Sequence, residues 1–429
     1  MLFRRSLSLL FFLFPLSSQA IYGELDSVYR HFDQKIDGRD ESRPQFQLSV
    51  QGGGDLGEHW RYKWNPIALF DPQSKVQVQK NFFDIYEAYI EYSKDVFSLK
   101  LGWLQQNWGV TEGFDPTAVL HSYRIWDPMD MKRLASLAAL AQWGWSSSLF
   151  EILVVPKRRR SMLPQQGSRW LPEGYLQTEQ VVDDFLFVLP ERLNYSYADS
   201  IELNRARDWN LGLRYYHQLD ELDASVFFYD GAAPVPFTQI GLVVDSIGTV
   251  NGRDAYFLNS QVTLTPIEYR QQTLGTTLVY NVAGFILRFA GSYQNTMGDF
   301  LALNDWQHSQ VYALERTFLG GRLTGLFEYS TVKREGGLNS TVSSISRLFD
   351  DTYLLALRGE INEQWSFLAS YLRQNIERDQ VYRISINGKL SDDWGVDLGW
   401  LSLAEDNPDT ALASYSKNDQ YWLKVQLYF

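Results

Sequence analysis

Cysteine is absent from the 429-residue chain, and its absence excludes several kinds of site. Without a thiol there is no disulfide framework, no lipoprotein attachment site and no thiolate metal site. Basic residues are in the minority, since 51 Asp and Glu outnumber 39 Lys and Arg and give a formal net charge of −12. This balance disfavours nucleic acid as a partner and places many acids on solvated loops and turns.

Long apolar runs are scarce as well. After Ala20 the most apolar stretch is 134–145, which is too short for a spanning helix and contains Gln142. Aromatic residues are plentiful by contrast, with 14 Trp, 25 Tyr and 26 Phe. A chain that can build aromatic girdles but has no helix-length apolar segment can enter a membrane only as strands.

Residues 1–20 have the pattern of a secretory signal peptide. Arg4 and Arg5 precede an apolar stretch over 7–16, and small residues stand at the −3 and −1 positions of a site after Ala20. The alternative is an N-terminal membrane anchor, but the apolar stretch is well short of the roughly 20 residues that a spanning helix needs. We therefore expect export, cleavage after Ala20 and delivery to the outer membrane.

The segment 420–429 shows the strictest alternation in the chain. Apolar side chains occupy every second position, as expected of a strand with one face toward lipid. The chain ends on an aromatic residue, so the segment resembles the terminal recognition strand of outer-membrane proteins, which implies contact with the barrel-assembly machinery. The alternative is an ordinary edge strand of a soluble sheet. The residues of this barrel-assembly signal are Tyr421, Leu423, Val425, Leu427 and Phe429.

The same alternation recurs upstream, separated by two kinds of connection. Short links such as 94–95 and 282–283 alternate with long ones such as 107–133 and 157–207. This alternation is typical of a barrel with tight periplasmic turns and long outer loops. Counting the segments predicts an all-β fold, namely a transmembrane antiparallel up-and-down β-barrel of about 16 strands, with roughly 14 to 18 as the range. The strands are expected at about 44–53, 82–93, 96–106, 134–144, 147–156, 208–218, 221–230, 268–280, 284–295, 305–316, 321–331, 352–361, 364–374, 380–390, 393–402 and 420–429.

The barrel domain is predicted to cover residues 44–429. Residues 21–43 are expected to form a short periplasmic or inward segment, because they are too few for the plug of a receptor-type transporter. Segments 57–69 and 74–81 fit either extensions of the neighbouring strands or an additional hairpin. A barrel of this size encloses a lumen, whereas side chains can fill a barrel of about eight strands.

Charged side chains of both signs fall on the inward register of these strands. In any polar barrel interior such groups pair with one another, which is the structural interpretation. The functional interpretation is that the basic members form a ladder for an anionic or polar solute, with the acids opposite setting a transverse field. The predicted lumen-lining residues are Lys100, Arg214, Arg288, Arg322, Arg358, Arg383, Lys389, Lys424, Glu87, Glu91, Asp223, Glu328, Glu360 and Asp397.

The long loop after residue 106 combines tryptophans with Asp-Pro steps. Asx side chains ahead of proline commonly hold turns, so its acids are interpreted as loop caps with arginine partners, and solute binding is the alternative. Its candidate residues are Trp108, Asp115, Arg124, Asp127 and Asp130.

This region also carries a family resemblance. The Gly-x-x-x-x-x-Trp-Gly strand end at 102–109, the Asp-Pro-x-Asp element at 127–130 and the preceding strand 86–91 resemble a broad group of large outer-membrane barrels of poorly defined substrate. The stretch 266–275 and the loop before Asp208 are similar to that group too. The resemblance covers much of the chain in short pieces and implies a porin-like barrel, although the first Asp of the Asp-Pro-x-Asp element stands where the group usually has Asn.

The loop 157–207 begins with four consecutive basic residues. A solvated charge run is one interpretation, and attraction of anionic solutes or outer-leaflet phosphates to the barrel mouth is the other. The apolar stretch 185–190 is not expected to lie in water, so we hypothesise that it folds into the mouth as a constriction. The candidate residues of the basic run are Arg158, Arg159 and Arg160.

No catalytic or metal constellation stands out in the sequence. None of the five His lies two to four residues from another His or in a His-x-Ser-Asn context, so we expect no enzyme, no cofactor and no metal site. The expected function is a porin-like channel that passes a small polar or anionic solute and is surrounded by outer-membrane lipid and lipopolysaccharide. The alternatives are the outer-membrane exit of an export or efflux pathway and a surface barrel for adhesion or assembly. Solute, direction and oligomeric state stay open.

Overall fold

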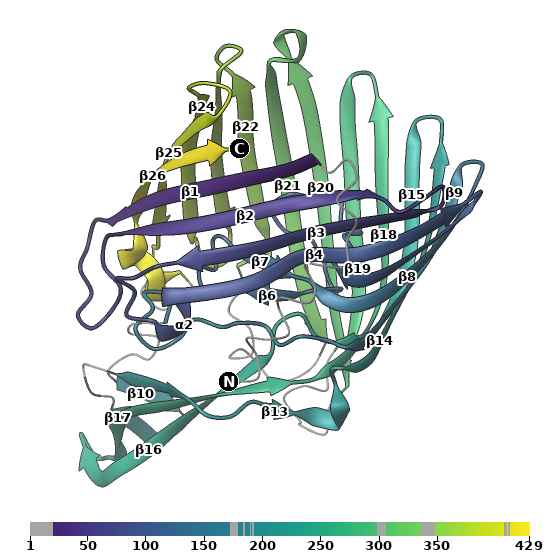
Figure 1. Ribbon diagram of the computed structural model, residues 1–429. Helices are drawn as coiled ribbons and strands as arrows, with labels where there is room; N and C mark the ends of the chain where they lie inside the picture. The colour runs from purple at the N-terminus through teal and green to yellow at the C-terminus, as the bar shows by residue number, and fades with distance from the viewer. Residues whose placement is uncertain are drawn as a thin grey trace, which may run out of the picture.

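The chain forms a closed antiparallel β-barrel (Figure 1). Eighteen strands make the wall, and it closes because β1 (Ala20–Phe32) pairs with β26 (Gln420–Tyr428). In this computed structural model the described residues are 20–171, 179–182, 185–188, 190, 193–297, 306–335, 348–406, 410 and 412–429, so the predicted signal peptide lies outside them up to residue 19. The other wall strands are β2 (Arg43–Asp55), β3 (Trp60–Phe70), β4 (Asn81–Lys94), β5 (Phe97–Leu104), β8 (Ser136–Trp145), β9 (Ser148–Lys157), β14 (Asp208–Leu219), β15 (Leu222–Ala232), β18 (Arg270–Val282), β19 (Phe285–Met297), β20 (Trp306–Phe318), β21 (Leu323–Glu335), β22 (Thr352–Glu360), β23 (Trp365–Gln374), β24 (Gln380–Lys389) and β25 (Trp394–Ala404).

The predicted all-β barrel is confirmed, and its 18 strands stand at the upper bound of the predicted range. The two strands beyond the expected set are β1 and β3. The assignment of residues 21–43 to a separate segment was wrong, because β1 is a full wall strand. Gly23 and Ser27 on its outer register weaken the alternation that marks a lipid-facing row. In β3 the pairing with β4 shifts between Asn65 and Pro66, which interrupts the period of two.

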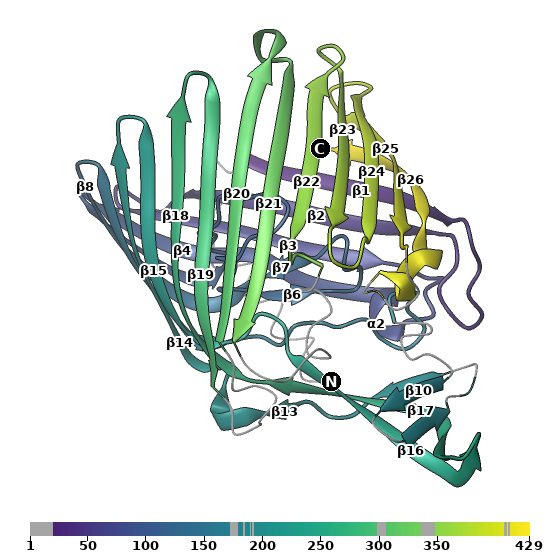
Figure 2. The same ribbon diagram turned by 180° about the vertical axis from the view of Figure 1, so that it is seen from behind.

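The two ends of the barrel differ in their connections (Figures 1 and 2). At the end that holds the C-terminus, which we call the turn end, neighbouring strands are joined by tight turns. Several of these turns place a residue in the left-handed region, as at Asp95, Ser146 and Ala283. The opposite end, which we call the loop end, carries all the long connections, including α2 (Gln77–Lys80) between β3 and β4.

Two long connections at the loop end build a second sheet of six strands. The hairpin of β16 (Phe237–Val250) and β17 (Arg253–Glu268) forms its centre, and it extends beyond the wall in both views. The connection from β9 to β14 runs alongside β17 in parallel pairings. The added strands are β10 (Glu179–Val182), β11 (Phe185–Val188), β12 (Asn194–Tyr197) and β13 (Ile201–Glu202). We call this unit the outer sheet.

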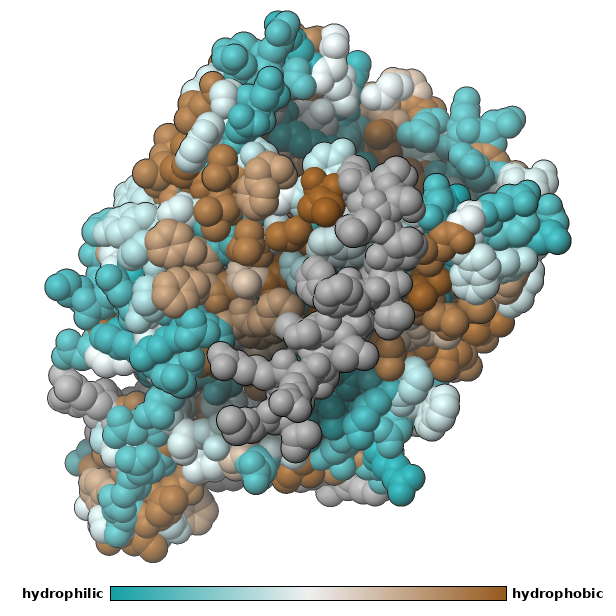
Figure 3. All heavy atoms as spheres, viewed as in Figure 1, coloured by the Kyte–Doolittle hydropathy of each residue, from teal (hydrophilic) through white to brown (hydrophobic). Residues whose placement is uncertain are grey.

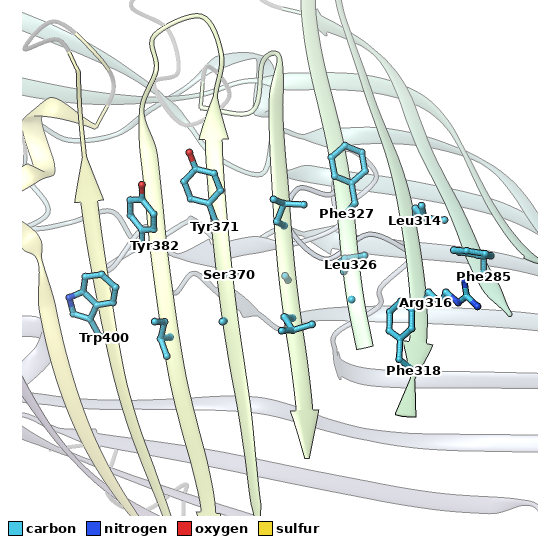
Figure 4. Close-up of a pocket in the computed structure, with 16 residues that line it drawn as sticks. Phe285, Leu314, Arg316, Phe318, Leu326, Phe327, Ser370, Tyr371, Tyr382 and Trp400 are labelled. Atoms are coloured by element: carbon cyan, nitrogen blue, oxygen red, sulfur yellow. The ribbon is translucent and has the colours of Figure 1, made fainter. Parts of the chain in front are cut away.

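The wall strands expose many large hydrophobic side chains, and brown side chains gather among white and teal ones on the side of the barrel seen in Figure 3. Across β19 to β25 the outer face of the wall has a shallow hollow of about 570 Å³, drawn in Figure 4. Tyr371, Tyr382 and Trp400 project from neighbouring strands beside it, and Arg316 lies 4.4 Å from the ring centre of Phe285. Such a surface suits hydrocarbon with an aromatic border. Among the described residues no helix is long and apolar enough to cross a membrane.

Candidate channel and its constriction

The connection between β5 and β8, residues 105–135, folds into the barrel. It contains the short strands β6 (Ser122–Arg124) and β7 (Lys132–Leu134). The side chain of Trp108 is only 1% exposed, and its ring centre lies 5.3 Å from that of Phe227 on β15. Gly212 of β14 makes room for the indole, because a Cβ there would lie 2.8 Å from it. The loop therefore packs against the inner wall and narrows the lumen from one side.

Arg158, the residue after β9, holds this loop in place through hydrogen bonds. Its side chain is 1% exposed. The guanidinium donates hydrogen bonds to the carbonyl oxygens of Val119 (3.0 Å), His121 and Ala232 and to the hydroxyl of Tyr229. Buried donors that all find acceptors can hold a structure without a carboxylate partner. The cation thus ties the inserted loop to β15 through hydrogen bonds.

The tip of the inserted loop reaches the opposite wall. The Glu328 carboxylate on β21 accepts hydrogen bonds from the backbone N–H groups of Glu112 and Gly113, both at 2.7 Å. Phe114 stacks on Phe349, with ring centres 4.6 Å apart. Strand β21 stands across the ring from β5, where the loop starts. The loop therefore crosses the lumen and divides its cross-section.

Charges of both signs surround the crossing point. Arg358 of β22 pairs with Glu112 at 3.0 Å and with Glu315 of β20 at 3.3 Å. Arg288 of β19 pairs with the same Glu315 at 2.8 Å. Acids and bases that face one another across a narrow passage set a transverse field on a passing solute. We call this group the constriction charges: Glu112, Arg288, Glu315, Glu328 and Arg358.

A second group of charges lies nearer the loop end, and we call it the loop-end cluster: Arg30, Arg124, Asp127, Asp130 and Arg383. Among the described residues the three guanidinium groups contact an amide, aromatic rings and an indole rather than a carboxylate. Burial raises the pKa of Asp127 to about 6, although Arg30 acts in the opposite direction. The cluster carries more positive than negative charge.

Besides Arg288 and Arg358, which pair with the unpredicted Glu315, two more of the predicted lumen-lining cations pair with acids that were not predicted. Arg214 lies 3.3 Å from Glu151 of β9, and Lys424 lies 3.8 Å from Asp26 of β1. Glu151 shares the inward-facing row of β9 with apolar residues that pack on the inserted loop. Both faces of β9 are therefore largely apolar, and the sequence pattern does not show which face points inward. Asp26 was missed because β1 was not predicted.

Other predicted wall residues pair along β3, β4 and β5. Glu91 lies 3.9 Å from Lys100, and Glu87 lies 2.7 Å from Lys63. At the C-terminal side of the wall, the Asp397 carboxylate accepts a hydrogen bond of 2.7 Å from an indole of β26.

The remaining predicted wall residues lie close to the turn end and are not among the constriction charges. Lys389 pairs with Asp392 of the following turn at 2.9 Å. Arg322 lies in the turn before β21. Glu360 is the last residue of β22 and Asp223 the second residue of β15.

The acids of the inserted loop hold its turns. One Asp115 oxygen accepts from the backbone N–H and the hydroxyl of Thr117, at 2.9 and 2.6 Å. Asp127 accepts from the N–H of Met129 at 2.9 Å, and Asp130 pairs at 2.6 Å with a lysine two residues on. These contacts are those of turn caps.

The basic run 157–160, which begins at the last residue of β9, is divided among different environments. Lys157 lies 3.5 Å from Asp208, and Arg158 is buried beneath the inserted loop. Arg159 lies 2.8 Å from Asp84 on the inner wall. Only Arg160 of the four is both exposed and without an ion pair among the described residues. The run is therefore not one solvated patch.

The hypothesis that the apolar stretch 185–190 constricts the mouth was wrong for its described part. Residues 185–188 form β11 and pair with β17 near the tip of the outer hairpin, while residue 189 lies outside the described residues. A different part of the same connection crosses the mouth. Arg169 donates to carbonyl oxygens of the β1–β2 and β25–β26 connections at 2.8 and 2.6 Å. Trp170 packs against two leucines of β25.

No protein-family model matches this sequence, and no curated protein sequence matches it. Solved structures do resemble it. OccAB3 of Acinetobacter baumannii is similar over 96% of this chain and 100% of its own, at 11% identity and a TM-score of 0.53. OccAB4 of the same organism is similar over 96% and 98%, at 10% identity and a TM-score of 0.52. OccD3 (OpdP) of Pseudomonas aeruginosa is similar over 96% and 91%, at 11% identity and a TM-score of 0.50.

The chain has the fold of an outer-membrane porin. At these identities the likeness concerns the fold alone, so the chemistry of this porin-like barrel rests on its own side chains. The closed wall and its apolar outer face agree with an outer-membrane location. In the described part of this porin-like barrel, no group of three or more His, Asp and Glu side chains is placed to hold a metal ion.

Proposed function

We propose that the protein is a porin-like channel of the outer membrane that passes small polar solutes, anionic ones included. The observation that carries this proposal is the inserted loop, whose tip meets Glu328 across the lumen at the constriction charges. A loop that only capped the barrel would not need a charged docking point on the far wall. A polar passage narrowed by fixed charges is the arrangement that selects solutes by size and charge.

The loop-end cluster supports the inclusion of anions. Arg30 and Arg383 lie on the inner wall near the mouth and make no ion pair within the part of the chain that the structure describes. Cations placed there raise the local concentration of anionic solutes before they reach the constriction. We infer that the loop end faces the outside, since long connections are extracellular in bacterial barrels.

The test is ion selectivity in planar lipid bilayers. The protein is expected to give stable conductance steps, and replacing both arginines with glutamine (Arg30→Gln, Arg383→Gln) is expected to shift the reversal potential toward cations under a salt gradient. Arg253→Gln, at the tip of the outer hairpin, is the matched control and should leave the potential unchanged. An unchanged potential in the double variant would remove the anion part of the proposal.

Several partners belong to the same proposal. Outer-membrane lipid and lipopolysaccharide would surround the wall, and the barrel-assembly machinery would read the last strand. Phe429, 63% exposed, exchanges backbone hydrogen bonds with Gly23 at 2.7 and 3.0 Å, so its ring is accessible beside the seam of the barrel. We also propose that Ala20 is the last residue of a cleaved signal peptide. No catalytic role is proposed.

A surface role is the second candidate, because the outer sheet has an exposed apolar edge. Among the described strands β16 pairs with β17 alone, and its Val243 and Ile247 side chains are 56% and 68% exposed. An unpaired apolar strand edge can bind another chain. A barrel that never conducts in bilayers but binds surfaces through this hairpin would favour adhesion over transport.

A further inference from the structure

A pocket of about 340 Å³ lies at the loop end, apart from the constriction charges. It is bounded by the inserted loop, the segment that follows the basic run, the connection after β12 and the base of β17. Its walls are largely apolar, with a few convergent polar groups, which is the make-up of small-molecule sites of this size. The lining includes Trp126, Arg160, Met162, Tyr197, Ser200 and Glu268.

Two ionisable groups of opposite sign face this pocket without a partner. Glu268 is only 4% exposed, and Arg160 is exposed; neither makes a hydrogen bond through its side chain, or an ion pair, with any described residue. The arginines near Glu268 are engaged elsewhere, since Arg207 pairs with Glu202 at 2.6 Å and Arg158 bonds to carbonyl oxygens. A buried carboxylate without a donor is costly, so a ligand cation would gain by meeting it.

Further polar groups of the pocket also lack partners. The indole N–H of Trp126 and the hydroxyl of Ser200 are buried with no hydrogen-bond partner among the described residues. Burial raises the pKa of Glu268, while Arg207 and Arg160 act against this shift. The pocket thus offers a carboxylate and a guanidinium beside a largely apolar wall.

We propose that this pocket binds a small zwitterion of the amino-acid type, with its ammonium group on Glu268, its carboxylate on Arg160 and its aliphatic part against Trp126 and Met162. A neutral sugar could stack on the same aromatic groups, but it would bring neither an ammonium group to Glu268 nor a carboxylate to Arg160. The inference rests on the proposed channel function only for the step after binding, namely delivery of the solute to the lumen.

The test uses L-leucine as the probe, with isothermal titration calorimetry on the full mature chain in detergent. N-acetyl-L-leucine lacks the ammonium group, L-leucinamide lacks the carboxylate, and glucose represents neutral polyols. We expect leucine to bind, and each analogue with one charge removed to bind about tenfold more weakly or worse, because a hydrogen bond between charged groups is lost. Glucose binding more tightly than leucine would overturn the proposal, as would equal affinity for leucine and both analogues.

Variants assign the two contacts. Glu268→Gln should weaken leucine about tenfold while abolishing the preference for leucine over N-acetyl-L-leucine, and Arg160→Gln should do the same relative to L-leucinamide. Glu363→Gln in a turn and Arg253→Gln in the outer hairpin are matched controls with exposed charges. If Glu268→Gln fails to fold, leucine binding by Arg160→Gln and analogue binding by the unmodified protein still test the proposal. Conductance measured on the same preparations separates the two proposals. Stable conductance steps without leucine binding would refute the ligand pocket and leave the channel function standing.

Discussion

The inserted loop should lose its docking when the Glu328 carboxylate is removed. In Glu328→Ala the N–H groups of Glu112 and Gly113, which now lie 2.7 Å from that carboxylate, lose their acceptors. Each hydrogen bond to a charged group contributes about 1.5–3 kcal/mol, so the pair contributes about 3–6 kcal/mol. Ordering two backbone residues at the tip costs about 2–4 kcal/mol.

The difference leaves a net preference of about 1–2 kcal/mol for the docked tip, which corresponds to a roughly 5–30-fold excess of docked over released loop. Without Glu328 that contribution is lost, and only the stacking of Phe114 on Phe349 and the Arg358–Glu112 ion pair still hold the tip. Single-channel recordings in planar bilayers should then show a higher mean conductance and larger fluctuations as the tip moves. Glu328→Gln should be intermediate, because one amide oxygen still accepts.

The control is Glu91→Ala, which removes an inward carboxylate that lies 3.9 Å from Lys100 on β5. It should leave the current noise unchanged. Identical conductance and noise in Glu328→Ala and the unmodified protein would refute the argument that this docking point narrows the channel.

The same geometry yields three more predictions. Arg158→Met should lower the free energy that favours the docked loop by about 3 kcal/mol or more, because buried carbonyl oxygens lose their donor. Limited proteolysis should then cut the loop faster, while the barrel still resists heat denaturation on gels. Leu355→Arg on the outer wall should lower stability in lipid by about 2–4 kcal/mol in urea titrations, whereas Ser366→Arg on the inner wall should cost less than about 1 kcal/mol. Burial holds the pKa of His121 at about 4, below its usual 6.5, so protons bind the released loop more tightly. Through His121 docking should therefore weaken as pH falls from about 6.5 to 4, by up to about 3 kcal/mol, and His121→Gln should remove this part of the pH dependence of the current noise. Protonation of Asp127, whose pKa burial raises to about 6, acts in the opposite direction and should remain in the variant.

The wall could be predicted from the sequence because a lipid-facing row leaves a period of two. Strand β26 shows this at every outer position, and the boundaries of its neighbours follow from the same rule. Strand β1 was not predicted because Gly23 and Ser27 interrupt its outer row. The strand count was therefore short by β1, which closes the ring on the distant β26, and by β3, whose pairing with β4 is shifted at Pro66.

The interior could be predicted only in part. Parity identified Arg358 and Glu328 as inward residues, but no periodic signal links Glu112 to them across more than two hundred positions of chain. Arg158 was grouped with its basic neighbours as surface charge, whereas tertiary packing buries it. Side chains of loops have no register, so their contacts follow from the folded wall and not from spacing in the sequence.

The most direct test of the central claim uses the absence of native cysteine. Glu112→Cys places one thiol at the tip of the inserted loop, and a bulky negatively charged methanethiosulfonate reagent can be added during single-channel recording. A water-filled lumen narrowed by this loop predicts stable steps whose conductance falls in one stage on modification and recovers with reductant. Complete labelling by mass spectrometry with unchanged conductance, or no conductance before labelling, would contradict it.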